Sequence, residues 1–338
     1  MSSAKIREER RHFYGDWTEE VCAKAGFWTN TSTEKVDIEY LPRHLRAERR
    51  WANIVQKCFN REKQQDFSNW KKWFICRCER PDAKLRLFCL PWAGGNSTSY
   101  ARWHEAFPDY EIVSVELPGR MMRAREPLVD EIDFIIHSLS TAMQRLALIR
   151  GKPFALFGHG YGAVLAYELG RGLHARFRRA PLRLLVAGSR APPHVRFQER
   201  VSALAPPELL AHLRALGPAG VPEVILGRPE LLDRVKPVLL ADQRALESYH
   251  HDPNGILPCP VLVLDATGDD IPEEEIRDWE LVTDEPVTLR EFEGGHFFIQ
   301  ETPGVVLKTI KEVLEEDLEN FQRGLQSASL IKKNRYLT

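Results

Sequence analysis

Six short apolar runs alternate with longer stretches of helical periodicity from Lys84 onward. Short buried strands joined by helices of this length form βαβ units, whose strands lie parallel in one sheet. The pattern predicts an α/β fold with a mostly parallel sheet and a helix-rich insertion at about 195–255. The runs are Leu85–Leu90, Ile112–Leu117, Phe154–Phe157, Leu182–Ala187, Val261–Asp265 and Val287–Phe292.

The chain divides into two unequal parts near Pro81. Its 338 residues are enough for one α/β domain and an appendage. We expect an N-terminal extension over residues 1–82, a main domain over 83–325 and a tail over 326–338. The extension is predicted to be helical, because apolar residues recur at helical spacing between Pro42 and Phe74. These residues are Leu45, Trp51, Ile54, Val55, Cys58 and Phe59.

Five of the eight tryptophans lie in this extension, at Trp17, Trp28, Trp51, Trp70 and Trp73. So much apolar surface must be covered, either by the main domain or by another protein. For the second alternative we favour Trp70 and Trp73, which flank two lysines. Residues 1–80 carry 17 Lys/Arg against 12 Asp/Glu, a charge of +5, and the remainder carries −6. This bias allows an acidic protein partner but is too small to indicate nucleic-acid binding.

The composition gives no sign of a membrane span, a secretory signal or a metal site. No apolar run approaches the roughly 18 residues that a membrane span needs. The first residues lack the apolar core of a secretory signal. The six cysteines show no paired framework, and Cys76 and Cys78 form a lone C-x-C pair. We therefore expect an intracellular, reducing compartment (cytoplasm or organelle matrix) and no metal or other cofactor.

The sharpest chemical signal is the turn Phe157-Gly158-His159-Gly160-Tyr161-Gly162-Ala163. It follows an apolar run and opens a helix predicted over Ala163–Leu173, which is the context of the G-x-S-x-G nucleophile elbow. Glycine stands at position 160, where that elbow has serine. The spacing fits neither the G-x-G-x-x-G nor the P-loop pattern, so nucleotide binding is not favoured.

Four further motifs surround this turn in a fixed order. With them, residues 84–318 resemble the stand-alone (type II) thioesterases, a family of the α/β-hydrolase superfamily that includes the medium-chain S-acyl fatty acid synthase thioesterase. The resemblance implies an α/β-hydrolase fold with a helical lid, no cofactor, and an acyl thioester on acyl carrier protein or coenzyme A as substrate. The motifs are Leu90-Pro91-Trp92-Ala93-Gly94-Gly95-Asn96-Ser97, Glu116-Leu117-Pro118-Gly119-Arg120, Pro237-Val238-Leu239-Leu240-Ala241-Asp242 and Gly294-Gly295-His296-Phe297.

The same resemblance assigns the site residues. His296 matches the catalytic base and Asp270 the acid that orients it, with Asp269 as the alternative. The backbone N–H groups of Ala93 and Tyr161 match the oxyanion-hole donors. A structural interpretation is also open for two of these assignments: a histidine held by a hydrogen bond, and an acidic loop that is only solvated. His159 is expected to be structural.

Glycine at position 160 has no side chain and cannot form an acyl-enzyme. Three interpretations follow. The chain is a pseudoenzyme with a structural or accessory role in a larger assembly, or it hydrolyses acyl thioesters through a water activated by His296, or its serine was replaced by engineering. The N-terminal extension favours the first interpretation, and the intact histidine and glycine-rich loop favour the other two.

Overall fold

The computed structural model describes residues 43–62, 69–197 and 200–335. These residues form a seven-stranded sheet in the order β1-β3-β2-β4-β5-β6-β7. Strand β1 runs antiparallel to β3, and every other neighbouring pair is parallel. The predicted α/β fold with a mostly parallel sheet is confirmed. The strands are β1 (Phe74–Ile75), β2 (Leu85–Leu90), β3 (Tyr110–Val115), β4 (Phe154–His159), β5 (Leu184–Ala187), β6 (Val261–Ala266) and β7 (Val287–Phe292).

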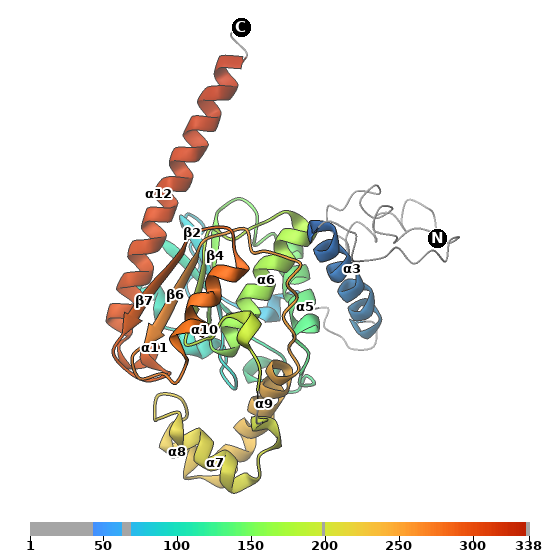
Figure 1. Cartoon of the computed structure of the whole chain (residues 1–338), viewed down its shortest axis with the longest axis vertical. Helices are drawn as coiled ribbons and strands as arrows, with labels where there is room; N and C mark the ends of the chain where they lie inside the picture. The colour runs from blue at the N-terminus through green and yellow to red at the C-terminus, as the bar shows by residue number, and fades with distance from the viewer. Residues whose placement is uncertain (1–42, 63–68, 198–199, 336–338) are drawn as a thin grey trace, which may run out of the picture.

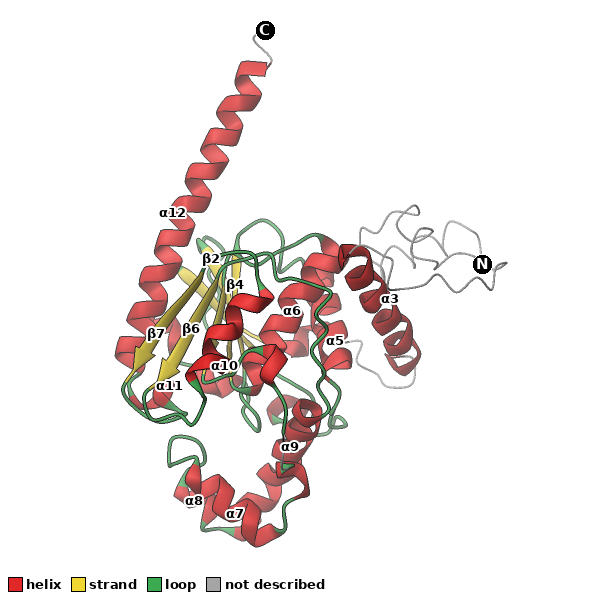
Figure 2. Cartoon of the chain, viewed as in Figure 1, coloured by secondary structure: helices red, strands yellow, loops and turns green. Residues whose placement is uncertain are grey.

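Helices cover both faces of the sheet (Figure 1, Figure 2). Successive residues of β2 divide between the two faces, with Phe88 and Leu90 on one and Leu87 and Cys89 on the other. The first face is covered by α3 (Arg43–Glu62), α5 (Ile132–Arg145) and α6 (Tyr161–Phe177), and the second by α4 (Trp103–Ala106) and α12 (Pro303–Arg335). The other α-helices in the described residues are α7 (Pro206–Ala215), α8 (Glu223–Leu226), α9 (Pro229–Glu247), α10 (Glu273–Arg277) and α11 (Phe298–Glu301).

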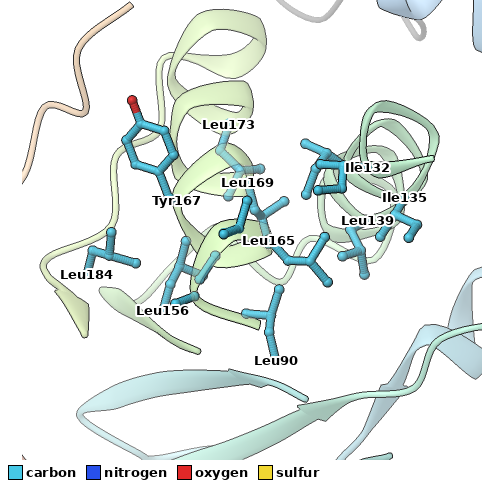
Figure 3. Packing of buried hydrophobic residues seen from close by; sticks show 14 of the residues in the cluster. Leu90, Ile132, Ile135, Leu139, Leu156, Leu165, Tyr167, Leu169, Leu173 and Leu184 are labelled. Atoms are coloured by element: carbon cyan, nitrogen blue, oxygen red, sulfur yellow. The ribbon is translucent and has the colours of Figure 1, made fainter. Parts of the chain in front are cut away.

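Helix α6 is the centre of the first face. It is buried around most of its circumference, because it lies between the sheet and other helices. Figure 3 shows Leu165 of α6 beside Leu139 of α5 and Leu90 of β2. Burying side chains of this size contributes about 1.5–3 kcal/mol each, so these contacts hold α6 against the sheet and against α5.

The described part of the extension packs against this same face. Trp51 of α3 is 1% exposed, and its ring lies 3.0 Å from the position that a Cβ atom would take at Gly172 of α6. Trp73 is fully buried beneath the guanidinium of Arg123, just before β1 joins the sheet. Docking onto another protein through Trp73 is therefore wrong, because the fold itself covers this side chain. Trp17 and Trp28 lie outside the described residues.

A buried ion-pair network ties α3 to α6. Arg50 of α3 donates to Glu168 at 2.9 Å, and Glu168 also accepts from Arg171 and Tyr249. Burial raises the pKa of Glu168, but the two arginines and the hydrogen bonds outweigh it and lower that pKa to about 2. Glu168 therefore stays ionised, and α3 supplies one of the charges that make its burial tolerable.

The insertion between β5 and β6 holds α7, α8 and α9, within the range predicted at 195–255. These helices lie beyond the carboxyl ends of the strands (Figure 1) and have a small apolar cluster of their own, formed by Leu209, Leu213, Leu226 and Leu239. Helix α12 continues through the segment expected as a tail, as far as Arg335. None of the helices in the described part of the chain is both long and apolar enough to span a membrane.

If α3 is part of the core, Trp51→Ala should lower the free energy of unfolding by about 3–5 kcal/mol, because it leaves a large cavity over α6. The matched control is Asn53→Ala, an exposed position on the same helix, which should change stability by less than about 0.5 kcal/mol. Chemical denaturation measures both. Equal, small effects of the two substitutions would show that α3 does not pack on the sheet as described.

Candidate active site

The elbow forms where β4 passes into α6. Gly160 joins them with φ 53° and ψ −115°, a conformation that costs energy for residues with a side chain. The neighbouring glycines are required by space: a Cβ atom at Gly158 would lie 2.0 Å from the carbonyl oxygen of Gly162, and one at Gly162 would lie 2.4 Å from that of Leu90. The sharp strand-to-helix turn predicted at position 160 is confirmed.

His296 faces this turn from the loop after β7. Its Nε2 atom lies 3.5 Å from the position that a Cβ atom would take at Gly160. Its Nδ1 atom lies 2.8 Å from Oδ2 of Asp269. A carboxylate can only accept a hydrogen bond, so Nδ1 of His296 carries the proton. In the neutral ring, the lone pair on Nε2 then points toward Gly160. The predicted approach of His296 to Gly160 is thus present.

The structure corrects the expectation for Asp270. The Asp269 N–H donates to Ala266 O at 3.0 Å in a tight turn after β6, and the Gly268 N–H donates to Gly294 O at 3.0 Å. These two bonds dock the loop against the segment that carries His296. They turn Asp269 inward, with a side chain 8% exposed, and leave Asp270 exposed. Asp269, the alternative in the sequence, makes the contact.

A cavity of about 890 Å³ opens over His296 and Asp269. Gly160, Tyr161, Ala93 and His296 all line it, so the expected oxyanion donors lie in the same chamber as the elbow. Apolar side chains from α6, the insertion and its flanks form much of the remaining wall, namely Val164, Val195, Val201, Leu216, Leu239 and Leu246. Volume and lining suit an acyl chain.

His159 is buried behind the elbow, with its ring centroid 4.8 Å from that of His296. Burial lowers the pKa of His159, and the nearby His296 lowers it further. The ring is therefore neutral and packs edge-on against Trp92 and Phe297. Among the described residues, no three His, Cys, Asp or Glu side chains gather as metal ligands would.

Two buried carboxylates hold the loop that carries Ala93, and the sequence analysis assigned a role to neither of them. Asp242 of α9 accepts from the Gly94 N–H at 2.8 Å and from both terminal nitrogens of Arg120 at 2.8 Å. Glu116 accepts from the N–H and the hydroxyl of Ser97. The available signal was a charged residue in a largely apolar motif, since buried charges are normally paired.

Residues 85–314 match the family model described as a thioesterase domain. The chain belongs to the thioesterase family. It is 35% identical over 223 residues to Thioesterase PikA5 of Streptomyces venezuelae, covering 65% of this chain and 78% of that protein. It is 29% identical over 232 residues to the human medium-chain S-acyl fatty acid synthase thioesterase, covering 67% and 85% of the two chains.

Solved structures agree with this assignment. The type II thioesterase BorB from the borrelidin biosynthetic cluster superposes with a TM-score of 0.64 at 34% identity, covering 73% of this chain and 98% of that one. The resemblance to type II thioesterases and the α/β-hydrolase fold expected from the sequence are both confirmed.

The His296–Asp269 contact predicts a ring N–H proton that is protected from exchange and visible by NMR of histidine-labelled protein. Asp269→Ala should remove this signal, because the Nδ1–H then loses its acceptor, whereas the matched Asp270→Ala should retain it. His296→Gln assigns the resonance. Loss of the signal in the Asp270 variant alone would show that Asp270, as first expected from the sequence, is the acid that contacts His296.

Proposed function

We propose that this protein binds acyl thioesters in the cavity beneath its lid without forming an acyl-enzyme, and that it serves a larger acyl-carrying assembly in an accessory role. The observation that carries the proposal is Gly160, which occupies the position of a nucleophile elbow beside the His296–Asp269 pair and a cavity with a largely apolar wall. The relatives support the substrate class, since one is named a fatty acid synthase thioesterase and another comes from a biosynthetic cluster. An acyl group on a carrier protein or on coenzyme A fits this chemistry.

The arithmetic of triad mutants supports a pseudoenzyme. Removing the nucleophile from a serine triad typically lowers kcat by a factor of about 10⁴–10⁶. The remaining cavity and oxyanion donors still bind the acyl group and polarise its carbonyl. A protein with this site would hold an acyl thioester far longer than a serine thioesterase does.

Slow direct hydrolysis is the second candidate, and the direction of His296 favours it. A water molecule near the unused Cβ position at Gly160 would donate to Nε2, which lies 3.5 Å from that position. Its oxygen would attack the thioester carbonyl while His296 takes the proton, and the imidazolium would return that proton to the departing thiolate. Asp269 would stabilise the charged ring throughout.

The partner proposal now rests on a smaller surface. Of the two tryptophans favoured for docking, Trp70 is half-buried with Arg145 over its ring. The lysines beside it are exposed, and Lys72 lies 3.5 Å from Glu126. A protein contact through the extension would therefore use the edge of Trp70 and these lysines.

Gly160→Ser tests the function directly. The new hydroxyl would lie within reach of Nε2, so we expect acyl-thioester hydrolysis with a burst of acyl-enzyme, about 10⁴-fold or more above the unchanged chain. Gly160→Ala is the control, because it adds the same backbone strain of about 1–3 kcal/mol without a hydroxyl. A thioester assay with thiol detection measures all three proteins. The same burst is expected if the glycine replaced a serine by engineering.

Two results would contradict the proposal. Equal hydrolysis by the glycine and serine forms would establish the water mechanism and rule out a pseudoenzyme. Failure of either form to bind an acyl thioester would remove the substrate class itself.

A further inference from the structure

Three sequence motifs that are far apart in the chain meet at one buried point behind the active site. Gly94 lies in the loop after β2, Arg120 in the loop after β3, and Asp242 on α9 of the lid. The Asp242 side chain is 0% exposed and that of Arg120 is 5% exposed. Arg120 also donates to Gly95 O at 2.9 Å, so it contacts the same loop as Asp242 does.

Stability alone does not explain this arrangement. A buried ion pair gains little over apolar residues of the same volume, because desolvation offsets the attraction. The Asp242–Arg120 pair, however, also holds a backbone group, the N–H of Gly94. One carboxylate oxygen, Oδ2, accepts both from Arg120 and from the backbone N–H of Gly94.

The loop around Gly94 has little freedom. Gly94 has φ +76°, and a Cβ atom there would lie 3.3 Å from Cδ1 of Leu239, one turn before Asp242 on α9. The Gly95 N–H closes a turn onto Trp92 O at 2.9 Å. Ala93 lies inside this turn and lines the active-site cavity. At the other end of the loop, Glu116 holds Ser97.

We propose that Asp242 is a positioning residue that sets the direction of the Ala93 N–H toward the cavity and so assembles the oxyanion hole only when α9 is seated. The inference rests on the proposed function, because it concerns the binding of an acyl carbonyl or carboxylate in that cavity. Through Asp242, the lid contributes a polar contact to the site in addition to part of its apolar wall. A lid helix that moves away would withdraw the carboxylate and release the loop.

The test compares two ligands that share an acyl chain and differ in the head group. Decanoate presents a charged oxygen to the donors at the elbow, as a thioesterase product does, whereas decanol fills only the apolar wall. Binding to the unchanged chain and to Asp242→Asn is measured by titration calorimetry. An amide keeps one acceptor oxygen and puts an NH₂ donor in place of the other, so in either orientation it turns a donor toward an N–H of Arg120, and this variant should displace the loop while leaving the volume intact.

We expect decanoate affinity to fall about tenfold or more in Asp242→Asn, as when one hydrogen bond to a charged group is lost, with decanol affinity unchanged. The matched control is Asp233→Asn, the same chemical change at an exposed position of α9, which should alter neither affinity. An equal fall for both ligands, or no fall for decanoate, would overturn the positioning role while leaving the acyl cavity in place. If the unchanged chain binds neither ligand, the proposed function and this inference both fail.

A second variant covers the case in which Asp242→Asn does not fold. Asp242→Leu combined with Arg120→Met removes both charges together and keeps the buried volume, a change that folded proteins commonly tolerate. This double variant should bind decanol normally and lose the same factor for decanoate. Retained decanoate affinity in a folded double variant would overturn the proposal.

Discussion

Helix α6 packs so closely on strands β2 and β4 that two positions admit no side chain. A Cβ atom at Gly158 or at Gly162 would overlap backbone atoms of the neighbouring turn or of Leu90. This steric constraint forces the chain through the sharp turn at Gly160 and directs that position into the cavity. It also places the start of α6, with the Tyr161 N–H, beside the loop of Ala93. The geometry of the site thus follows from backbone packing before any catalytic side chain is considered.

The residue at the apex of this turn is where the protein departs from serine thioesterases. With φ at 53°, a serine would hold a strained backbone, and glycine relieves that strain while removing the nucleophile. The surrounding parts do not depend on the missing hydroxyl. Asp269 contacts Nδ1 of His296, and the buried carboxylates of Asp242 and Glu116 hold the loop that carries Ala93. A site built in this way retains its shape when the nucleophile is absent.

The described part of the N-terminal extension completes the first face of the sheet. Trp51 covers α6, Trp73 lies under Arg123, and Arg50 neutralises part of the charge of Glu168. The network makes α3 as much a part of the core as α5. It also explains how so many large aromatic side chains are accommodated in this segment, since two of the five tryptophans are buried by the domain itself.

The sequence by itself determined the parallel sheet, the elbow at Gly160 and the place of His296, because period, turn glycines and motif order are local properties of the chain. The strand boundaries predicted from the sequence lie close to those in the structure. The run Leu85–Leu90 is β2, whereas β3 begins two residues before the expected Ile112. Only the tertiary structure decided between Asp269 and Asp270, because one of the two bonds that turn Asp269 inward joins its loop to the loop after β7. It alone buried Trp73 and joined Asp242 to Arg120 and Gly94. The Asp242 contacts join residues more than a hundred positions apart, and spacing along the chain could not predict them.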